Sequence, residues 1–127
     1  MGLTDMLQDT ATRERLQDFA NRYDQGKPWE GISEDEAREQ HDRVAAQLDD
    51  NEYEQSARES FQRLDPDQRR EAAQSLRAGD TDDPGELARA ANRVRKEQPD
   101  MLGQLMSNPA IKGAVAGIAA QAAKKVL

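Results

Sequence analysis

Helix start signals recur along this sequence and constrain it to a chain of short helices. Three of them place a capping residue directly before a proline: Asp65-Pro66, Asp83-Pro84 and Asn108-Pro109. Proline is tolerated at the first helical position, because its missing N–H would have no intrahelical partner there. These starts predict helices over residues 66–78, 84–98 and 109–126, with Gly79 as the C-cap of the first. A short helix over 99–106 is expected to join the last two.

Three further helices are expected upstream, each with apolar residues at helical spacing. Thr10 or Thr12 can cap the first, which reaches Tyr23. Ser33 with Glu36 is a capping box for the second, and Asn51 with Glu54 repeats that pattern for the third. Their apolar faces carry Leu16, Phe19, Ala20 and Tyr23; then Ala37, His41, Val44, Ala45 and Leu48; then Tyr53, Ala57, Phe61 and Leu64.

No stretch alternates with period two for long enough to form a strand, so the prediction is an all-α protein of six or seven short helices. We expect an acidic helical body over residues 1–78 and a linker with a basic-faced helix over 79–107. A Gly/Ala-rich amphipathic helix over 108–127 completes the chain as a helical C-terminal extension of the compact body.

The predicted core is thin, because alanine supplies 19 of the 45 apolar residues. Val, Ile, Leu and Phe together number 19 of 127 residues, or 15%. That fraction is below the roughly 20% at which disorder competes with folding. The apolar residues are nevertheless well patterned, so we expect a folded chain of marginal stability.

Composition excludes several classes of protein. The chain has no cysteine, which excludes disulfide frameworks and thiol chemistry, and its single histidine excludes a multi-histidine metal site. The N-terminus has no basic, apolar signal pattern, and the longest uncharged stretch near the C-terminus, residues 113–123, is too short to span a bilayer. We therefore expect a cytoplasmic protein. An excess of Asp over Glu and of Arg over Lys is typical of salt adaptation or of a GC-rich genome.

Charge is divided unequally along the chain. The net charge is -7, with 17 acidic and 8 basic residues in 1–65 and 8 acidic and 10 basic residues in 66–127. This acidic surplus argues against wholesale nucleic-acid binding. Residues 108–127 carry three lysines and no acid, which favours contact of this segment with the acidic half or with a second copy.

The C-terminal helix is the main candidate for an interaction site. One face carries Ile111, Gly113, Val115, Gly117, Ile118, Ala122 and Val126. Glycines four residues apart allow two helices to approach closely. Three interpretations stay open: an ordinary core helix, a docking helix for a second copy or another protein's helix, and a membrane-surface helix helped by Lys112, Lys124 and Lys125. The last is the weakest, because the apolar face is mostly alanine.

Each of the remaining candidate residues has a structural interpretation as well as a functional one. Arg89, Arg93 and Lys96 share a helix face, with Arg95 nearby, and one helix earlier lie three further bases: Arg69, Arg70 and Arg77. These bases could bind phosphate or an acidic protein, or could form a solvated face. Trp29 is either a lid over the core or an anchor for a partner. His41 is expected to be a partly buried, hydrogen-bonded histidine. The segment from Asp80 to Glu86 resembles a calcium loop but lacks two of the required ligands.

Four segments carry a resemblance to known proteins. The start MGLTDML, the loop RYDQG-x-PWEG ending at Gly31, the stretch from Glu52 to Pro66 and the tail from Asn108 to Lys125 are similar to a set of small bacterial proteins of unknown activity. The resemblance implies a bacterial helical protein and transfers no activity, ligand or site residue.

The function expected from sequence is therefore that of a non-enzymatic interaction protein. Its C-terminal small-residue helix would pack against a partner or a second copy, with Trp29, Arg89, Arg93 and Lys96 as secondary contacts. The alternative is a peripheral membrane-associated stress or adapter protein held by the basic amphipathic tail. No catalytic residue, cofactor or metal site is predicted.

Overall fold

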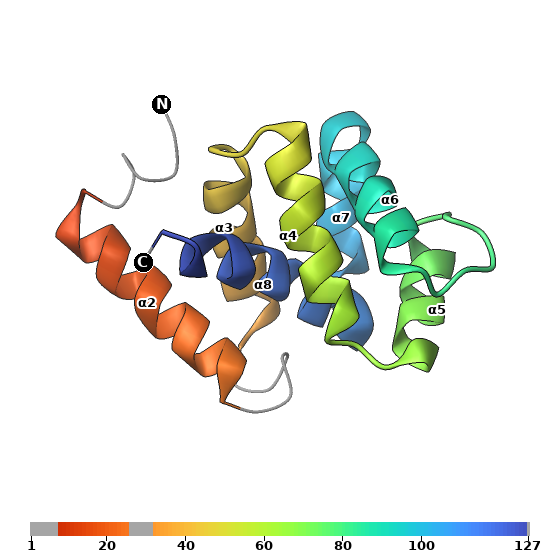
Figure 1. The fold of residues 1–127 in the computed structure, drawn as a ribbon, viewed down its shortest axis with the longest axis horizontal. Coiled ribbons are helices and arrows are strands. Elements are labelled where there is room, and N and C mark those ends of the chain that lie inside the picture. Colours follow the sequence, from red (N-terminus) through yellow and green to blue (C-terminus); the bar gives the residue numbers. More distant parts are fainter. Residues whose placement is uncertain (1–7, 26–31, 127) are drawn as a thin grey trace.

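In the computed structural model, residues 8–25 and 32–126 are described, and every regular element among them is helical (Figure 1). This confirms the predicted all-α fold class. The elements are α2 (Thr10–Asp24), α3 (Glu34–Ala45), α4 (Asp50–Gln62), α5 (Pro66–Ser75), α6 (Pro84–Glu97), α7 (Pro99–Gln104), a 3-10 turn (Leu105–Ser107) and α8 (Pro109–Lys124). No described helix is long and apolar enough to cross a membrane.

The capping residues form the hydrogen bonds that the sequence predicts at most helix starts. Ser33 accepts from the N–H of Glu36 at 3.1 Å, and Asn108 accepts from the N–H of Ala110 at 2.9 Å. The predicted start of α4 is wrong by two residues, because Asp49 and Glu52, rather than Asn51 and Glu54, form its capping box. The earlier start closes two reciprocal hydrogen bonds, and it leaves Glu54 to bind α6.

The end of α5 also differs from the prediction. The helix ends at Ser75, and Arg77 rather than Gly79 takes the left-handed cap position, with φ of +58°. The N–H of Ala78 then reaches back to the carbonyl of Ala73 at 2.8 Å, which closes a Schellman cap. Gly79 also has a positive φ, +91°, but lies two residues further on. Arginine therefore occupies a backbone position that favours glycine.

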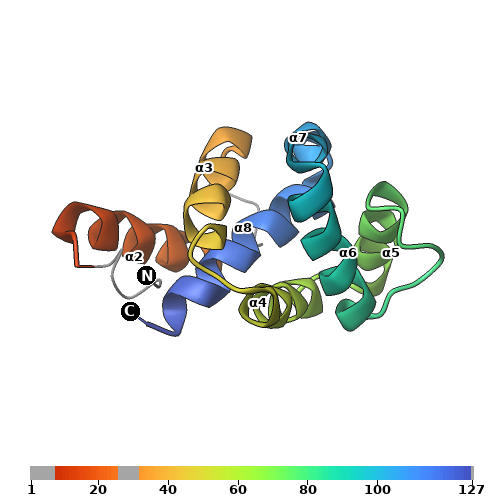
Figure 2. The ribbon, with the colours of Figure 1, turned by 90° about the horizontal axis from the view of Figure 1, so that it is seen from above.

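The C-terminal helix runs through the body rather than standing apart from it. In both views α8 passes between the other helices, with α2 at one end of the molecule and α5 and α6 at the other (Figures 1 and 2). It packs against α2, α3, α4 and α5, and 12 of its 16 residues are buried. The alanine-rich sequence of α8 is thus the centre of the core.

Gly117 marks the closest approach in this core. A Cβ atom at this position would lie 2.5 Å from the Tyr23 hydroxyl of α2 and closer still to the Ser60 hydroxyl of α4. The Ser60 hydroxyl also donates to the carbonyl of Ala114, one turn earlier in α8, at 2.7 Å. The absence of a side chain therefore lets α2 and α4 pack on the backbone of α8.

We expect Gly117→Ala to destabilise the fold by about 1–3 kcal/mol, because the added methyl group overlaps two buried hydroxyls. Denaturant unfolding followed by circular dichroism would measure the loss. Gly103→Ala is the matched control, since there the added methyl meets the flexible end of Arg38. Equal stability of both variants would contradict this account of the core.

Candidate functional site

The structure places the predicted interaction stripe inside a single chain. Ile111, Val115, Ile118 and Ala122 are at most 3% exposed, and Gly113 and Gly117 are also buried, while Val126 is 39% exposed. The expectation that this stripe faces a partner is therefore corrected for the folded monomer, because α2, α3 and α4 already cover it. Of the three interpretations of the helix, the burial agrees with the ordinary core helix.

The lysines of the C-terminal segment mostly pair with the body of the protein. Lys124 contacts Asp24 at 3.1 Å, and Lys125 contacts Glu59 at 2.7 Å. Lys112 is half-buried and forms no ion pair with a described residue. The tail thus lies against the acidic half of the chain, as its charge predicts. This placement gives no support to the membrane-surface interpretation.

Of the other predicted contact residues, Lys96 is exposed but its ammonium group is already paired. Lys96 pairs with Asp50 at 2.9 Å. Trp29 lies outside the described residues. In the segment from Asp80 to Glu86, Asp83 caps α6 by accepting from the N–H of Glu86 at 3.3 Å. The described residues contain no group of three or more His, Asp and Glu side chains able to hold a metal ion.

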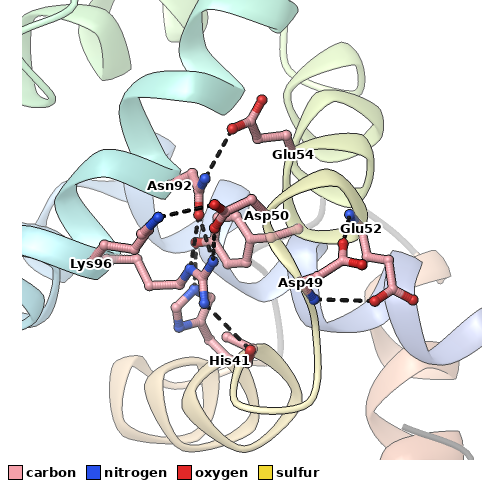
Figure 3. A network of polar contacts seen from close by, with 10 residues as sticks. His41, Asp49, Asp50, Glu52, Glu54, Asn92 and Lys96 are labelled. Atoms are coloured by element: carbon pink, nitrogen blue, oxygen red, sulfur yellow. Dashed lines mark hydrogen bonds and ion pairs between the residues drawn. The ribbon is translucent and has the colours of Figure 1, made fainter. Parts of the chain in front are cut away.

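A buried polar network joins α3, α4 and α6 (Figure 3). His41 is 2% exposed; its Nδ1 lies 3.0 Å from Asp42 Oδ1 and its Nε2 lies 2.7 Å from the Tyr53 hydroxyl. Because a carboxylate only accepts, Nδ1 donates, and in neutral His41 the Nε2 atom accepts from Tyr53. Burial raises the pKa of Tyr53, so its hydroxyl stays protonated.

Arg95 of α6 extends this network. Its guanidinium lies 4.1 Å from the centroid of the Tyr53 ring, a cation–π contact. It also donates to Asn92 Oδ1 at 2.5 Å and lies 3.5 Å from Asp50. Asn92 in turn donates to Glu54 at 2.9 Å, as Figure 3 shows. These contacts fix α6 on α4.

The centre of the network is closed to solvent. Tyr53 is fully buried, and the cavity beside His41 has a volume of only about 10 Å³. A cavity of that size barely holds one water molecule. A substrate therefore cannot reach the Tyr53 hydroxyl in this conformation.

The open side of α6 carries a different arrangement, which we call the arginine surface: Arg58, Arg77, Arg89 and Arg93. All four side chains are exposed, and none forms a hydrogen bond or ion pair with another described residue. Nine other arginines and lysines do form ion pairs: Arg22, Arg38, Arg43, Arg63, Arg70, Arg95, Lys96, Lys124 and Lys125. The arginine surface thus carries positive charge that no described side chain neutralises.

Three grooves follow α6 along this surface. The first, of about 240 Å³, lies between α4 and the start of α6 and is lined by Arg58 and Arg89 together with polar side chains. The second, of about 230 Å³, includes Arg77, Arg89 and Arg93. The third, of about 190 Å³, includes Arg77 and Arg93 again. The first and second grooves share Arg89, and the second and third share Arg77 and Arg93, so the three are neighbours along α6; together we call them the track.

The third groove is lined by both polar and apolar side chains. Leu76 and Val94 are buried at its base, and the partly buried Met101 of α7 lies beside them. Three carboxylates share the track: Glu54, Glu86 and Glu97. Glu54 accepts from Asn92, whereas Glu86 and Glu97 form no ion pair with a described residue. Arginines and carboxylates are therefore interspersed along the track.

Arg77 gives this surface its most specific feature. It is the one non-glycine residue with positive φ among the described residues, and its side chain lines two of the three grooves. The left-handed conformation costs an L-residue about 1–2 kcal/mol. Strain of this kind, retained where glycine would relieve it, points to a role for the side chain.

Comparison with known proteins gives no relative: no protein-family model, curated protein or solved structure matches this chain. The resemblance to small bacterial helical proteins stays a prediction. The site is therefore defined by its own geometry.

Sequence reasoning found Arg89 and Arg93 and named Arg77 among the bases one helix earlier, but it missed Arg58. Arg58 lies on α4, and only the packing of α4 on α6 brings it to the track. The left-handed backbone of Arg77 was not expected, because Gly79 was the predicted cap. The network of His41, Tyr53 and Arg95 was also missed, although the helical spacing that placed His41 and Tyr53 on apolar faces was a signal for part of it.

Acid is expected to destabilise the protein in part through Asp42. Its hydrogen bond from His41 lowers the pKa of this carboxyl below 3.8. Because the pKa of Asp42 is lower in the folded chain than in the unfolded chain, its ionised form stabilises the fold at a pH above the unfolded-state pKa. This contribution is lost as the pH falls through the folded-state pKa. Unfolding measured between roughly pH 5 and pH 2 should thus depend less on pH in Asp42→Asn. Asp80→Asn, whose side chain has no described partner, is the control and should follow the wild type; identical profiles for all three proteins would contradict the expectation.

Replacing Arg77 by glycine should stabilise the protein. Relief of the left-handed strain outweighs the extra freedom of glycine in the unfolded chain, with a net gain of up to about 1 kcal/mol. Thermal and denaturant unfolding would measure it. Arg77→Ala also removes the guanidinium but keeps the strain, so it should show no such gain. If Arg77→Ala were as stable as Arg77→Gly, the left-handed backbone at this position would not be strained, and the explanation would be wrong.

Proposed function

We propose that the protein is a non-enzymatic interaction module that binds an acidic partner protein at the arginine surface. One observation carries this proposal: four exposed arginines without a described partner line three neighbouring grooves on a chain whose net charge is -7. Arginine clusters are a recurrent means of recognising acidic motifs. Their guanidinium groups can each bind a carboxylate through two hydrogen bonds.

Two features favour a protein partner over a nucleic acid. No aromatic side chain lines any of the three grooves, so bases would have no platform on which to stack. Glu54, Glu86 and Glu97 interrupt the arginines, and a continuous phosphate backbone would be repelled by them. A peptide can place neutral residues opposite these carboxylates.

The first test is binding of fluorescein-labelled polyglutamate at low ionic strength, followed by fluorescence anisotropy. We expect saturable binding that weakens with added salt. The triple variant Arg77→Gln, Arg89→Gln and Arg93→Gln should bind at least about tenfold more weakly, because three charged contacts are lost. Glu86→Gln should bind more tightly than the wild type, because it removes a repelling charge.

The matched control removes three positive charges elsewhere: Arg13→Gln, Arg15→Gln and Lys112→Gln. None of these forms a described ion pair, and Arg13 and Arg15 lie on α2, at the opposite end of the molecule from α6 (Figure 1). This variant should retain most of the affinity. An equal loss of polyglutamate affinity in the two triple variants would show that only the net charge matters, and it would contradict the proposal. Tighter binding of single-stranded DNA than of polyglutamate would also contradict the proposal.

A further inference from the structure

The two ends of the track on α6 differ in chemistry, and this difference defines the partner more closely. The groove at the start of α6 is lined mainly by polar groups: Asn51, Glu54, Gln55, Arg58 and Arg89, beside Gly85 and Ala88. The groove at its end lies over Leu76, Val94 and Met101, with Arg77 and Arg93 at the rim. A ligand that fits both ends needs charge at one and an apolar group at the other.

The length of the track indicates what kind of segment can span it. Gly85 and Glu97 line the first and last grooves and are twelve residues apart on one helix. That separation corresponds to about 18 Å along the axis. An extended chain covers this distance with about six residues, at roughly 3.3 Å each.

From this we infer that the partner is an extended acidic peptide segment anchored by one apolar side chain. The apolar side chain would lie on Leu76, Val94 and Met101, and carboxylates about two to five residues away would pair with Arg93, Arg89 and Arg58. This inference rests on the proposed function and adds to it the conformation of the ligand and the position of its anchor.

The carboxylate of Glu97 supports an apolar rather than an acidic residue at the anchor position. Glu97 lines the same groove as Met101 and forms no ion pair with a described residue, so a partner carboxylate there would be repelled. An uncharged side chain avoids this repulsion, and it covers apolar surface of Met101 that is otherwise in water. The position next to the anchor can still reach Arg77 or Arg93.

The test uses labelled acidic octapeptides that carry a single leucine near one end, in both chain orders, and the same peptides with alanine in place of leucine. Anisotropy titrations with the full-length protein give the affinities. Only one of the two chain orders can place the leucine on Met101 while the carboxylates reach the arginines. In that order the leucine peptide should bind roughly tenfold more tightly than its alanine counterpart. The Met101→Ala variant should lose most of this difference while it still binds polyglutamate.

Leu105→Ala is the matched control, because Leu105 is also partly buried against the core but does not line the groove. It should keep the leucine preference. Equal binding of leucine and alanine peptides in both orders would overturn the anchor, while the proposed function would stand if polyglutamate binding still required the arginines. A leucine preference that persists in Met101→Ala would place the anchor elsewhere and would also overturn the inference.

Discussion

The packing of helices against the backbone of α8 is the constraint on which the rest of the structure depends. With few large apolar side chains, the chain cannot fill a wide core, so its helices must approach closely. Gly117 and the alanines of α8 permit that approach, and Ser60 adds a hydrogen bond to the carbonyl of Ala114. The stabilising van der Waals contacts of this core come from many closely packed small side chains rather than from a few large ones.

This central position of α8 decides which surfaces remain for a partner. The small-residue stripe is used within the chain, and Lys124 and Lys125 are held by ion pairs. On α6, by contrast, one face packs on α4 through Asn92 and Arg95, while Arg89 and Arg93 lie on the exposed face. The buried network and the arginine surface are thus two sides of one helix, and the first holds the second in place.

The features of this structure that could be predicted from the sequence are those set by residues close together in the chain. Capping residues and helical spacing depend on neighbours within a few residues, so the helices and the fold class were predictable. The errors are at three caps: Asp9 rather than Thr10 or Thr12 precedes α2, Asp49 rather than Asn51 caps α4, and Arg77 rather than Gly79 ends α5. The role of α8 was not predictable, because a Gly/Ala stripe has the same pattern whether it packs on its own chain or on another. Of the candidate site, Arg89 and Arg93 lie on one helix and were found. Arg77 was named among the bases one helix earlier, but its left-handed backbone was not expected. Arg58 joined them only through the packing of α4 on α6.

The central claim is that the grooves along α6 are where an acidic segment binds, and chemical-shift mapping tests it most directly. Amide spectra of ¹⁵N-labelled protein would be recorded during titration with an acidic peptide that carries one leucine. The account predicts shifts concentrated at Leu76–Ala78, along α6 and at Met101, with α2 unaffected. Shifts spread evenly over the surface, or concentrated on α2 or α3, would contradict it.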